Sequence, residues 1–156
     1  MKKTFLFTLI ALFLATFAFS QDSADADRLT GVWEPSNGKV KVKIDKIGDK
    51  YYGKIVWLRE PIDPNTNAPK VDRNNPDANL TSTPLKGYRI LKDFEYTGKD
   101  EWTEGTIYDP ENGSTYSCTI KMSDPNTLDI RGYIGISALG RSDVWKRLQM
   151  PSKKRK

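Results

Sequence analysis

The stretch Lys39-Val40-Lys41-Val42-Lys43-Ile44-Asp45 alternates between apolar and charged side chains at every position. Successive side chains of a β-strand point to opposite faces, so this period of two predicts a strand with one buried face and one solvated face. Val40, Val42 and Ile44 are expected to face the interior. The preceding dipeptide Asn37-Gly38 is typical of a tight hairpin turn. The segment therefore indicates antiparallel β structure.

Short strands separated by turn residues continue along the chain after residue 20. The expected strands are Thr30–Glu34, Lys39–Lys46, Lys50–Leu58, Lys86–Tyr96, Glu101–Tyr108, Thr115–Met122, Thr127–Ile134 and Arg141–Leu148. Pairs of Gly, Asn, Asp and Pro separate most of them, which favours hairpins. No segment after residue 20 combines helical apolar spacing with helix caps.

Eight strands joined mostly by hairpins favour a small all-β fold, an antiparallel up-and-down barrel. Closure of the sheet removes the exposed edges that promote aggregation. A barrel of eight strands has an interior that is filled by side chains or holds one small ligand. Gly53, Gly105 and Gly132 each begin a Gly-x-Ile motif inside an expected strand. Glycine at such positions usually indicates a bend or bulge.

The first 20 residues have the features of a signal peptide. Met1-Lys2-Lys3 is basic, residues 4–19 are almost entirely apolar, and Ala18-Phe19-Ser20 supplies small residues for cleavage. We expect cleavage after Ser20 and a periplasmic or secreted protein. The alternative is an uncleaved membrane anchor, but a spanning helix needs about 20 apolar residues and this run is shorter. No membrane span is expected in the mature chain.

The chain is therefore divided into four segments. Residues 1–20 are the signal peptide, 21–28 a flexible N-terminal segment, 29–149 the barrel domain and 150–156 a basic tail. A mature chain of this length suits one domain with a modest core. The tail is expected to be solvated, with weak attraction to anionic lipid or polysaccharide as the alternative.

The formal charge of +5 does not indicate a nucleic-acid partner. Lys2 and Lys3 leave with the signal peptide, and four basic residues lie in the tail, so residues 21–152 carry a net charge of −1. A basic surface of the kind that binds nucleic acid is not expected.

Histidine is absent and Cys118 is the sole cysteine, which restricts the possible chemistry. His-dependent nucleophile systems, His-ligated metals and an intramolecular disulfide are excluded. Cys118 shares the parity of apolar neighbours, so a buried thiol is expected. The Asp63-x-Asn65-x-Asn67 spacing resembles the start of a calcium loop, but Ala68 and Asn74 replace the required Gly and Glu. No metal, cofactor or catalytic residue is assigned.

The connection Arg59–Leu85 is much longer than the other turns. Loops beyond about 12–15 residues are often functional. Its Pro and Asx residues favour an ordered flap, and it is the first candidate for selecting a partner.

Several motifs together resemble the bacterial family called domain of unknown function 2147. They are Gly31-x-Trp33, residues 53–58, Glu60-Pro61, Asp72-x-x-Asn75-Pro76-Asp77, Pro84-Leu85-x-Gly87, Trp102-x-x-Gly105-x-Ile107-Tyr108-Asp109-Pro110, Gly113-x-x-Tyr116, Leu128-x-x-Arg131-Gly132-Tyr133-Ile134-Gly135, and Leu139-Gly140-Arg141 with Trp145. The resemblance implies export and a calycin-like barrel and supplies no function. Two arginines often precede the proline of the Pro-Leu-x-Gly motif in that family, whereas Thr81 and Thr83 occupy the stretch here.

A weaker likeness to lipocalins concerns barrel closure. Their first strand opens with Gly-x-Trp, and an arginine near the end of the last strand packs over that tryptophan. The resemblance implies these structural roles for Gly31, Trp33 and Arg147. Stacking of an arginine on an indole contributes about 0.5–2 kcal/mol. Trp145 is the competing partner of Arg147.

Six residues are candidate ligand contacts: Trp57, Asp72, Asn75, Asp77, Tyr108 and Arg131. Trp57 and Tyr108 each end a strand beside a loop that contains proline, where a pocket mouth is usual. The other four belong to the family-like motifs.

Three hypotheses for function follow. The first is an exported binding protein that holds a small apolar or amphipathic molecule, with Arg59–Leu85 as its flap. The second is an envelope interaction protein with a filled barrel. The third is a carboxylate-based hydrolase, which needs two acidic side chains facing each other across one cleft. A cavity above about 300 Å³ favours the first over the second.

Overall fold

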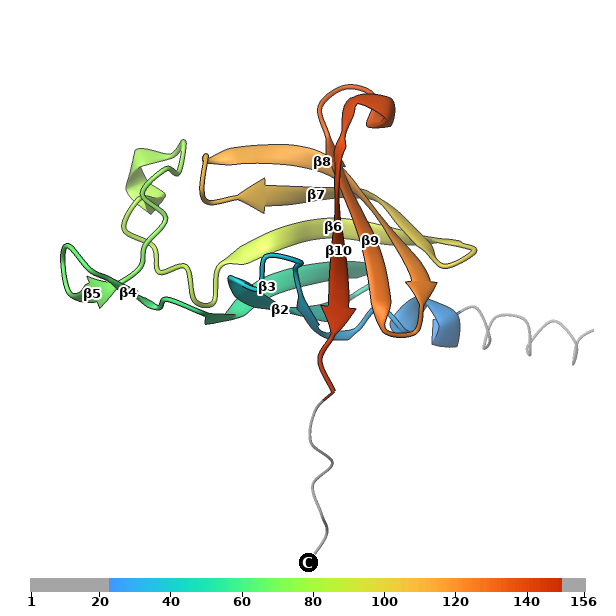
Figure 1. Cartoon of the computed structure of the whole chain (residues 1–156). Coiled ribbons are helices and arrows are strands. Elements are labelled where there is room, and N and C mark those ends of the chain that lie inside the picture. The colour runs from blue at the N-terminus through green and yellow to red at the C-terminus, as the bar shows by residue number, and fades with distance from the viewer. Residues whose placement is uncertain (1–22, 150–156) are drawn as a thin grey trace, which may run out of the picture.

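The computed structural model describes residues 23–149 (Figure 1). The expected signal peptide and basic tail lie outside the described residues. Within them, eight strands form the barrel: β1 (Gly31–Glu34), β2 (Val40–Ile47), β3 (Lys50–Leu58), β6 (Arg89–Gly98), β7 (Glu101–Asp109), β8 (Ser114–Asp124), β9 (Thr127–Tyr133) and β10 (Arg141–Arg147). Two short strands, β4 (Ile62–Asp63) and β5 (Ala68–Pro69), pair with each other in the long loop.

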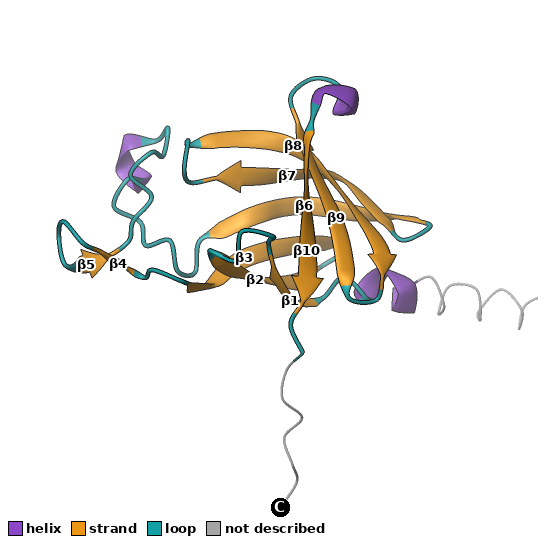
Figure 2. Ribbon diagram, in the orientation of Figure 1, coloured by secondary structure: helices purple, strands orange, loops and turns teal. Residues whose placement is uncertain are grey.

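The eight strands close in the order β1-β10-β9-β8-β7-β6-β3-β2, and every neighbouring pair is antiparallel. The expected eight-stranded up-and-down barrel is confirmed, and loops and hairpin turns connect its strands (Figure 2). Strand β3 has the expected bounds. Strand β6 starts at Arg89 instead of Lys86 because a turn, in which the Tyr88 N–H donates to the Leu85 carbonyl, precedes it.

The segment expected to be flexible contains a short helix over residues 23–27. Ala26 and Leu29 are buried against the barrel. The Trp33 indole donates to the Leu29 carbonyl at 2.9 Å, and Tyr51 donates its hydroxyl proton to Asp27 at 2.7 Å. A helix of little more than one turn has too few apolar positions to reveal itself in the sequence. This helix and the 3-10 helices η1 (Ala78–Leu80) and η2 (Ser137–Leu139) are too short to span a membrane, as is every helix in the part of the chain that the structure describes.

Arg147 holds one end of the barrel together. Its guanidinium carbon lies 4.0 Å from the centre of the Trp33 ring. The same group donates to the carbonyls of Arg28, Thr30 and Pro125, which belong to the N-terminal segment and to the β8–β9 turn. Burial lowers the pKa of this guanidinium. Arg147 thus lies over Trp33, and the planar fork of its donors joins three chain segments.

Gly31 makes room for this contact. Its φ is +139°, and a Cβ there would lie 2.5 Å from Nη1 of Arg147. Any side chain at this position would displace the guanidinium from the indole. Gly31, Trp33 and Arg147 therefore form one structural unit at the end that we call the closed end.

The half of the barrel next to the closed end is filled by large side chains. Its buried members are Leu29, Trp33, Val42, Ile44, Tyr51, Leu91, Phe94, Trp102, Cys118, Ile120, Met122 and Leu128. The Leu91 side chain occupies the space over Gly53. The Phe94 ring occupies the space over Gly105, where a Cβ would lie 2.4 Å from the ring. Both glycines coincide with irregularities in strand register. Burial raises the pKa of the Cys118 thiol to about 12.

We predict that Arg147→Lys lowers the free energy of unfolding by about 2–4 kcal/mol, because a single ammonium group cannot replace three hydrogen bonds and the stacking on Trp33. Urea unfolding of the mature protein measures the change. Arg89→Lys is the matched control, since Arg89 is exposed and lies over Tyr52 on the outer surface. Equal stability of the two variants would contradict the role of Arg147.

Candidate functional site

The barrel opens at the end opposite Arg147. Strand β1 is four residues long and pairs with β10 only at Trp33 and Glu34. Beyond that point residues 141–145 of β10 pair with β9 alone. In Figure 1, β9 and β10 turn away from β2 and β3 at this end. The short first strand therefore leaves a gap between β10 and β2.

A cavity of about 1010 Å³ occupies the open half. Its apolar wall consists of Val40, Ile55, Leu58, Leu85, Ile90, Ile107, Ile130 and Trp145, and three tyrosines, Tyr108, Tyr116 and Tyr133, also line it. Gly132 also lines it, in a regular part of β9, and has no side chain to fill the space. Ligand cavities usually measure about 300–1,000 Å³ and have mostly apolar walls. The size and lining match a site for a small molecule.

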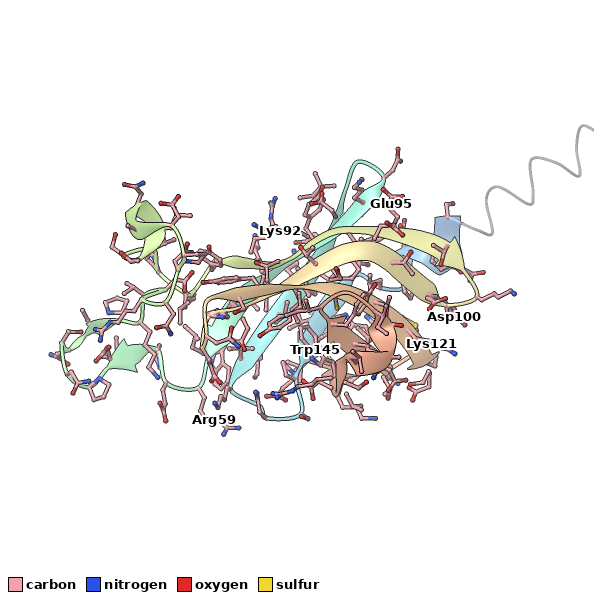
Figure 3. The ribbon with its side chains drawn as sticks, turned by 90° about the horizontal axis from the view of Figure 1, so that it is seen from above. Arg59, Lys92, Glu95, Asp100, Lys121 and Trp145 are labelled. Atoms are coloured by element: carbon pink, nitrogen blue, oxygen red, sulfur yellow. The ribbon has the colours of Figure 1, made fainter. Side chains whose placement is uncertain are left out.

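Charged side chains surround the mouth of the cavity. The basic ones are Lys39, Arg59, Lys70 and Arg141, and the acidic ones are Glu60, Asp109, Glu111 and Asp143. Figure 3, seen from above, places Arg59 at the edge of the barrel and Trp145 among the strands. Apolar walls with a charged rim suit an amphipathic ligand better than a wholly polar one.

The loop between β9 and β10 forms part of this rim and is held by Arg131. The guanidinium of Arg131 donates to the carbonyls of Ser137 and Ala138 and to the hydroxyl of Ser142. The loop nevertheless leaves three aliphatic side chains largely exposed: Ile134 at 73%, Ile136 at 63% and Leu139 at 79%. Ile134 and Leu139 line the cavity mouth.

A buried carboxylate lies behind the cavity wall. Asp72 is fully buried and accepts hydrogen bonds from the Tyr108 hydroxyl at 2.8 Å and from Nδ2 of Asn75 at 2.6 Å. Asn75 Nδ2 also donates to the Tyr88 hydroxyl at 2.8 Å. The rings of Tyr88 and Tyr108 lie 5.5 Å apart. This network connects the long loop to strand β7 and to the wall of the cavity.

Burial raises the pKa of Tyr108, and its hydrogen bond to Asp72 raises it further. Burial also raises the pKa of Tyr88. Both hydroxyls therefore stay protonated at neutral pH and act as hydrogen-bond partners. Their role is to position the loop and the wall.

The long loop stands beside the mouth of the cavity. Only Arg59, Glu60, Lys70 and Leu85 of the loop line the cavity. Strands β4 and β5 and helix η1 project from the barrel (Figure 1). The loop is ordered by turns, as expected, but it lies at the rim and does not cover the mouth as a flap would.

Of the six candidate ligand contacts, only Tyr108 lines the cavity. Asp72 and Asn75 support Tyr108 from behind. Asp77 accepts a hydrogen bond from the Asn79 N–H and caps η1. Arg131 braces the β9–β10 loop on the outside of the barrel.

Trp57 lies on the outer surface because of a bulge. The register between β2 and β3 shifts between Lys41 and Val42, which leaves Val56 as an extra residue of β3. Leu58 consequently faces inward, while Trp57 is exposed beneath the Lys41 ammonium, 4.5 Å from the ring centre.

The cavity is also lined by residues that are not among the six candidate ligand contacts, chiefly Ile130, Gly132, Arg141 and Trp145. Ile130 and Gly132 are alternate residues of β9 and face the barrel interior. The alternation along this strand could therefore have predicted that they line the cavity. The contribution of Arg141 depends on how the β9–β10 loop folds, and the local sequence does not specify that.

The structure gives Asp63 a local role. One carboxylate oxygen accepts from the Asn65 N–H at 2.8 Å, and the other pairs with Arg73 at 2.6 Å. Across residues 23–149 no group of three or more Asp, Glu or Cys side chains is arranged to hold a metal ion. The Asx turn explains the calcium-like spacing.

Comparison with known proteins places the chain in a bacterial family. Residues 31–147 match the family described as an uncharacterized protein conserved in bacteria (DUF2147), and the chain belongs to this family. No curated protein matches the chain. The structure is similar to that of protein HP1028 from Helicobacter pylori, reported to belong to the lipocalin family.

The similarity to HP1028 has a TM-score of 0.66 at 24% sequence identity and covers 78% of this chain and 83% of that chain. It supports the calycin-like fold. The octameric penicillin-binding protein homologue from Pyrococcus abyssi is less similar to this chain than HP1028 is. Its TM-score is 0.41 at 13% sequence identity, and the match covers 81% of this chain and 20% of that chain. That score is too low to indicate a common fold.

We predict that Asp72→Ala lowers the free energy of unfolding by about 1–3 kcal/mol, because the buried hydroxyl of Tyr108 and the amide of Asn75 lose their acceptor. Trypsin cleavage after Lys70 and Arg73 is expected to accelerate as the loop detaches. Asp77→Ala serves as the matched control, since its carboxylate is exposed and caps only a short helix. Cleavage at the same rate in both variants would show that Asp72 does not anchor the loop.

Proposed function

We propose that this protein is an exported carrier that binds a small apolar or amphipathic molecule in the cavity at the open end of its barrel. The observation that supports the proposal most strongly is the cavity of about 1010 Å³ with an aliphatic and aromatic wall. An envelope protein acting only through its surface requires no interior space. The cavity therefore favours the ligand hypothesis over a filled barrel.

The residues of the cavity wall indicate which kind of ligand the cavity would bind. Aliphatic side chains from β2, β3, β6, β7 and β9, together with Trp145 of β10, would contact the apolar part of a ligand. Such contacts are not directional and would not orient it. Tyr116 and Tyr133 supply a few polar groups that would orient a ligand. Burial of apolar ligand surface contributes about 25 cal/mol per Å², which is enough for a molecule of moderate size to bind.

Export is part of the proposal and rests on the sequence. The basic start, the apolar run and the small residues before Gln21 are the features that a signal peptidase reads. A carrier outside the cytoplasm would move a poorly soluble molecule across an aqueous compartment.

Gly132→Leu tests the proposal. A Cβ at Gly132 meets only ordinary contacts, 3.4 Å from Ile107 and 3.6 Å from Tyr116, so the backbone position accepts a side chain, and we expect the leucine to extend into the cavity that Gly132 lines. Protein isolated from the envelope or medium of the native cells is examined by native mass spectrometry. We expect the wild type to begin at Gln21 and to carry a bound small molecule, and we expect Gly132→Leu to lose most of that adduct.

Thr119→Leu is the matched control, because Thr119 faces outward on the neighbouring strand β8 while Cys118 and Ile120 face inward. It should retain the adduct. A wild-type protein without any bound molecule, or an adduct equally present in all three proteins, would count against binding in the cavity. An intact residue 1–20 segment on the isolated protein would count against export.

A further inference from the structure

We propose that the ligand carries an acidic head group, which the guanidinium groups of Arg59 and Arg141 bind at the mouth of the cavity. The inference deepens the proposed function and rests on it. Neither arginine has been assigned a role so far. The two side chains line the same cavity: Arg59 follows β3, and Arg141 is the first residue of β10.

Four of the eight charged groups of the rim are paired with each other. Lys39 pairs with Glu111 at 2.5 Å, and Lys70 pairs with Glu60 at 2.9 Å. The guanidinium groups of Arg59 and Arg141 form neither a hydrogen bond nor an ion pair with any residue in the described range 23–149.

The remaining acidic groups of the rim are engaged with the chain itself. Asp109 accepts from the Glu111 N–H at 2.9 Å. Asp143 accepts from the Val144 N–H and from the Trp145 indole, both at 2.9 Å. These carboxylates keep their charge but accept hydrogen bonds from the chain, whereas the donors of the two guanidinium groups have no partner in residues 23–149. The arginines are therefore the charged groups of the rim whose hydrogen-bonding capacity is unused.

Exposed apolar side chains line the same mouth as Arg141. Leu139 and Ile134 line the same mouth and are mostly exposed to water. Arg131 holds their loop in place by hydrogen bonds to the carbonyls of Ser137 and Ala138. A molecule with an apolar body and an acidic end would cover these side chains and pair with the guanidinium in one binding mode.

The chemistry of arginine favours a carboxylate or a similar anion over a neutral polar group. The guanidinium presents donors in a fixed plane that matches two oxygens of a carboxylate, and such charge-assisted bonds are stronger than neutral ones. Hydrogen bonds to charged groups correspond to about tenfold or more in affinity at a partly desolvated site.

Three probes with unbranched chains of equal carbon number separate head-group recognition from cavity binding: dodecanoate, dodecan-1-ol and dodecyltrimethylammonium. Isothermal titration calorimetry with the mature protein measures their affinities. We expect dodecanoate to bind about tenfold or more tightly than dodecan-1-ol, and the cationic probe to bind most weakly. Arg59→Gln and Arg141→Gln should each reduce the preference for the acid, and the double variant should bind acid and alcohol alike.

Arg89→Gln is the matched control, because it removes the same charge from the outer surface, where Arg89 lies over Tyr52. It should keep the preference of the wild type. Arg59 and Arg141 are exposed, so unchanged urea unfolding of their variants will confirm that folding is intact. Equal affinity for all three probes would overturn the head-group inference and leave the proposed carrier function standing. Absence of binding by every probe would contradict both.

Discussion

The stacking of Arg147 on Trp33 is the interaction on which the barrel depends, because the first strand is too short to close the sheet by itself. Two residue pairs join β1 to β10. The guanidinium adds hydrogen bonds to carbonyls of the N-terminal segment and of the β8–β9 turn, so chain segments far apart in sequence meet at one planar group. Closure at this end is complete. Because β1 is so short, β10 and β2 stay separated at the opposite end of the barrel, and the cavity opens there.

Side-chain volume along the strands divides the interior into a filled half and a hollow half. Phe94 and Leu91 fill the space above Gly105 and Gly53. Gly132 has no such neighbour filling its place, and the smaller aliphatic side chains around it leave room. The proposed carrier function needs both properties: rigid packing to keep the shape of the site and a wall that does not collapse into it. In that proposal the charged residues at the rim add selectivity to the apolar contact.

The strands were predictable from the sequence because their signal is local. Alternation in residues 39–45 and turn residues between strands specify hairpins without knowledge of the tertiary structure. The site was less predictable, because it depends on contacts between distant residues. Asp72 and Tyr108 are far apart in the chain, and Trp57 faces outward because of one bulge that alternation alone does not reveal. The short helix over residues 23–27 likewise becomes stable only against the completed closed end.

The indole N–H resonances of the four tryptophans provide the most direct test of a ligand site confined to the open half. Trp145 lines the cavity, Trp33 and Trp102 lie in the filled half, and Trp57 lies on the outer surface. In a titration of the isotopically labelled mature protein with dodecanoate, followed by two-dimensional NMR, we expect a saturable shift of the Trp145 indole resonance and little change of the Trp33 and Trp102 resonances. A shift confined to Trp57, or no shift of Trp145 at saturation, would contradict it.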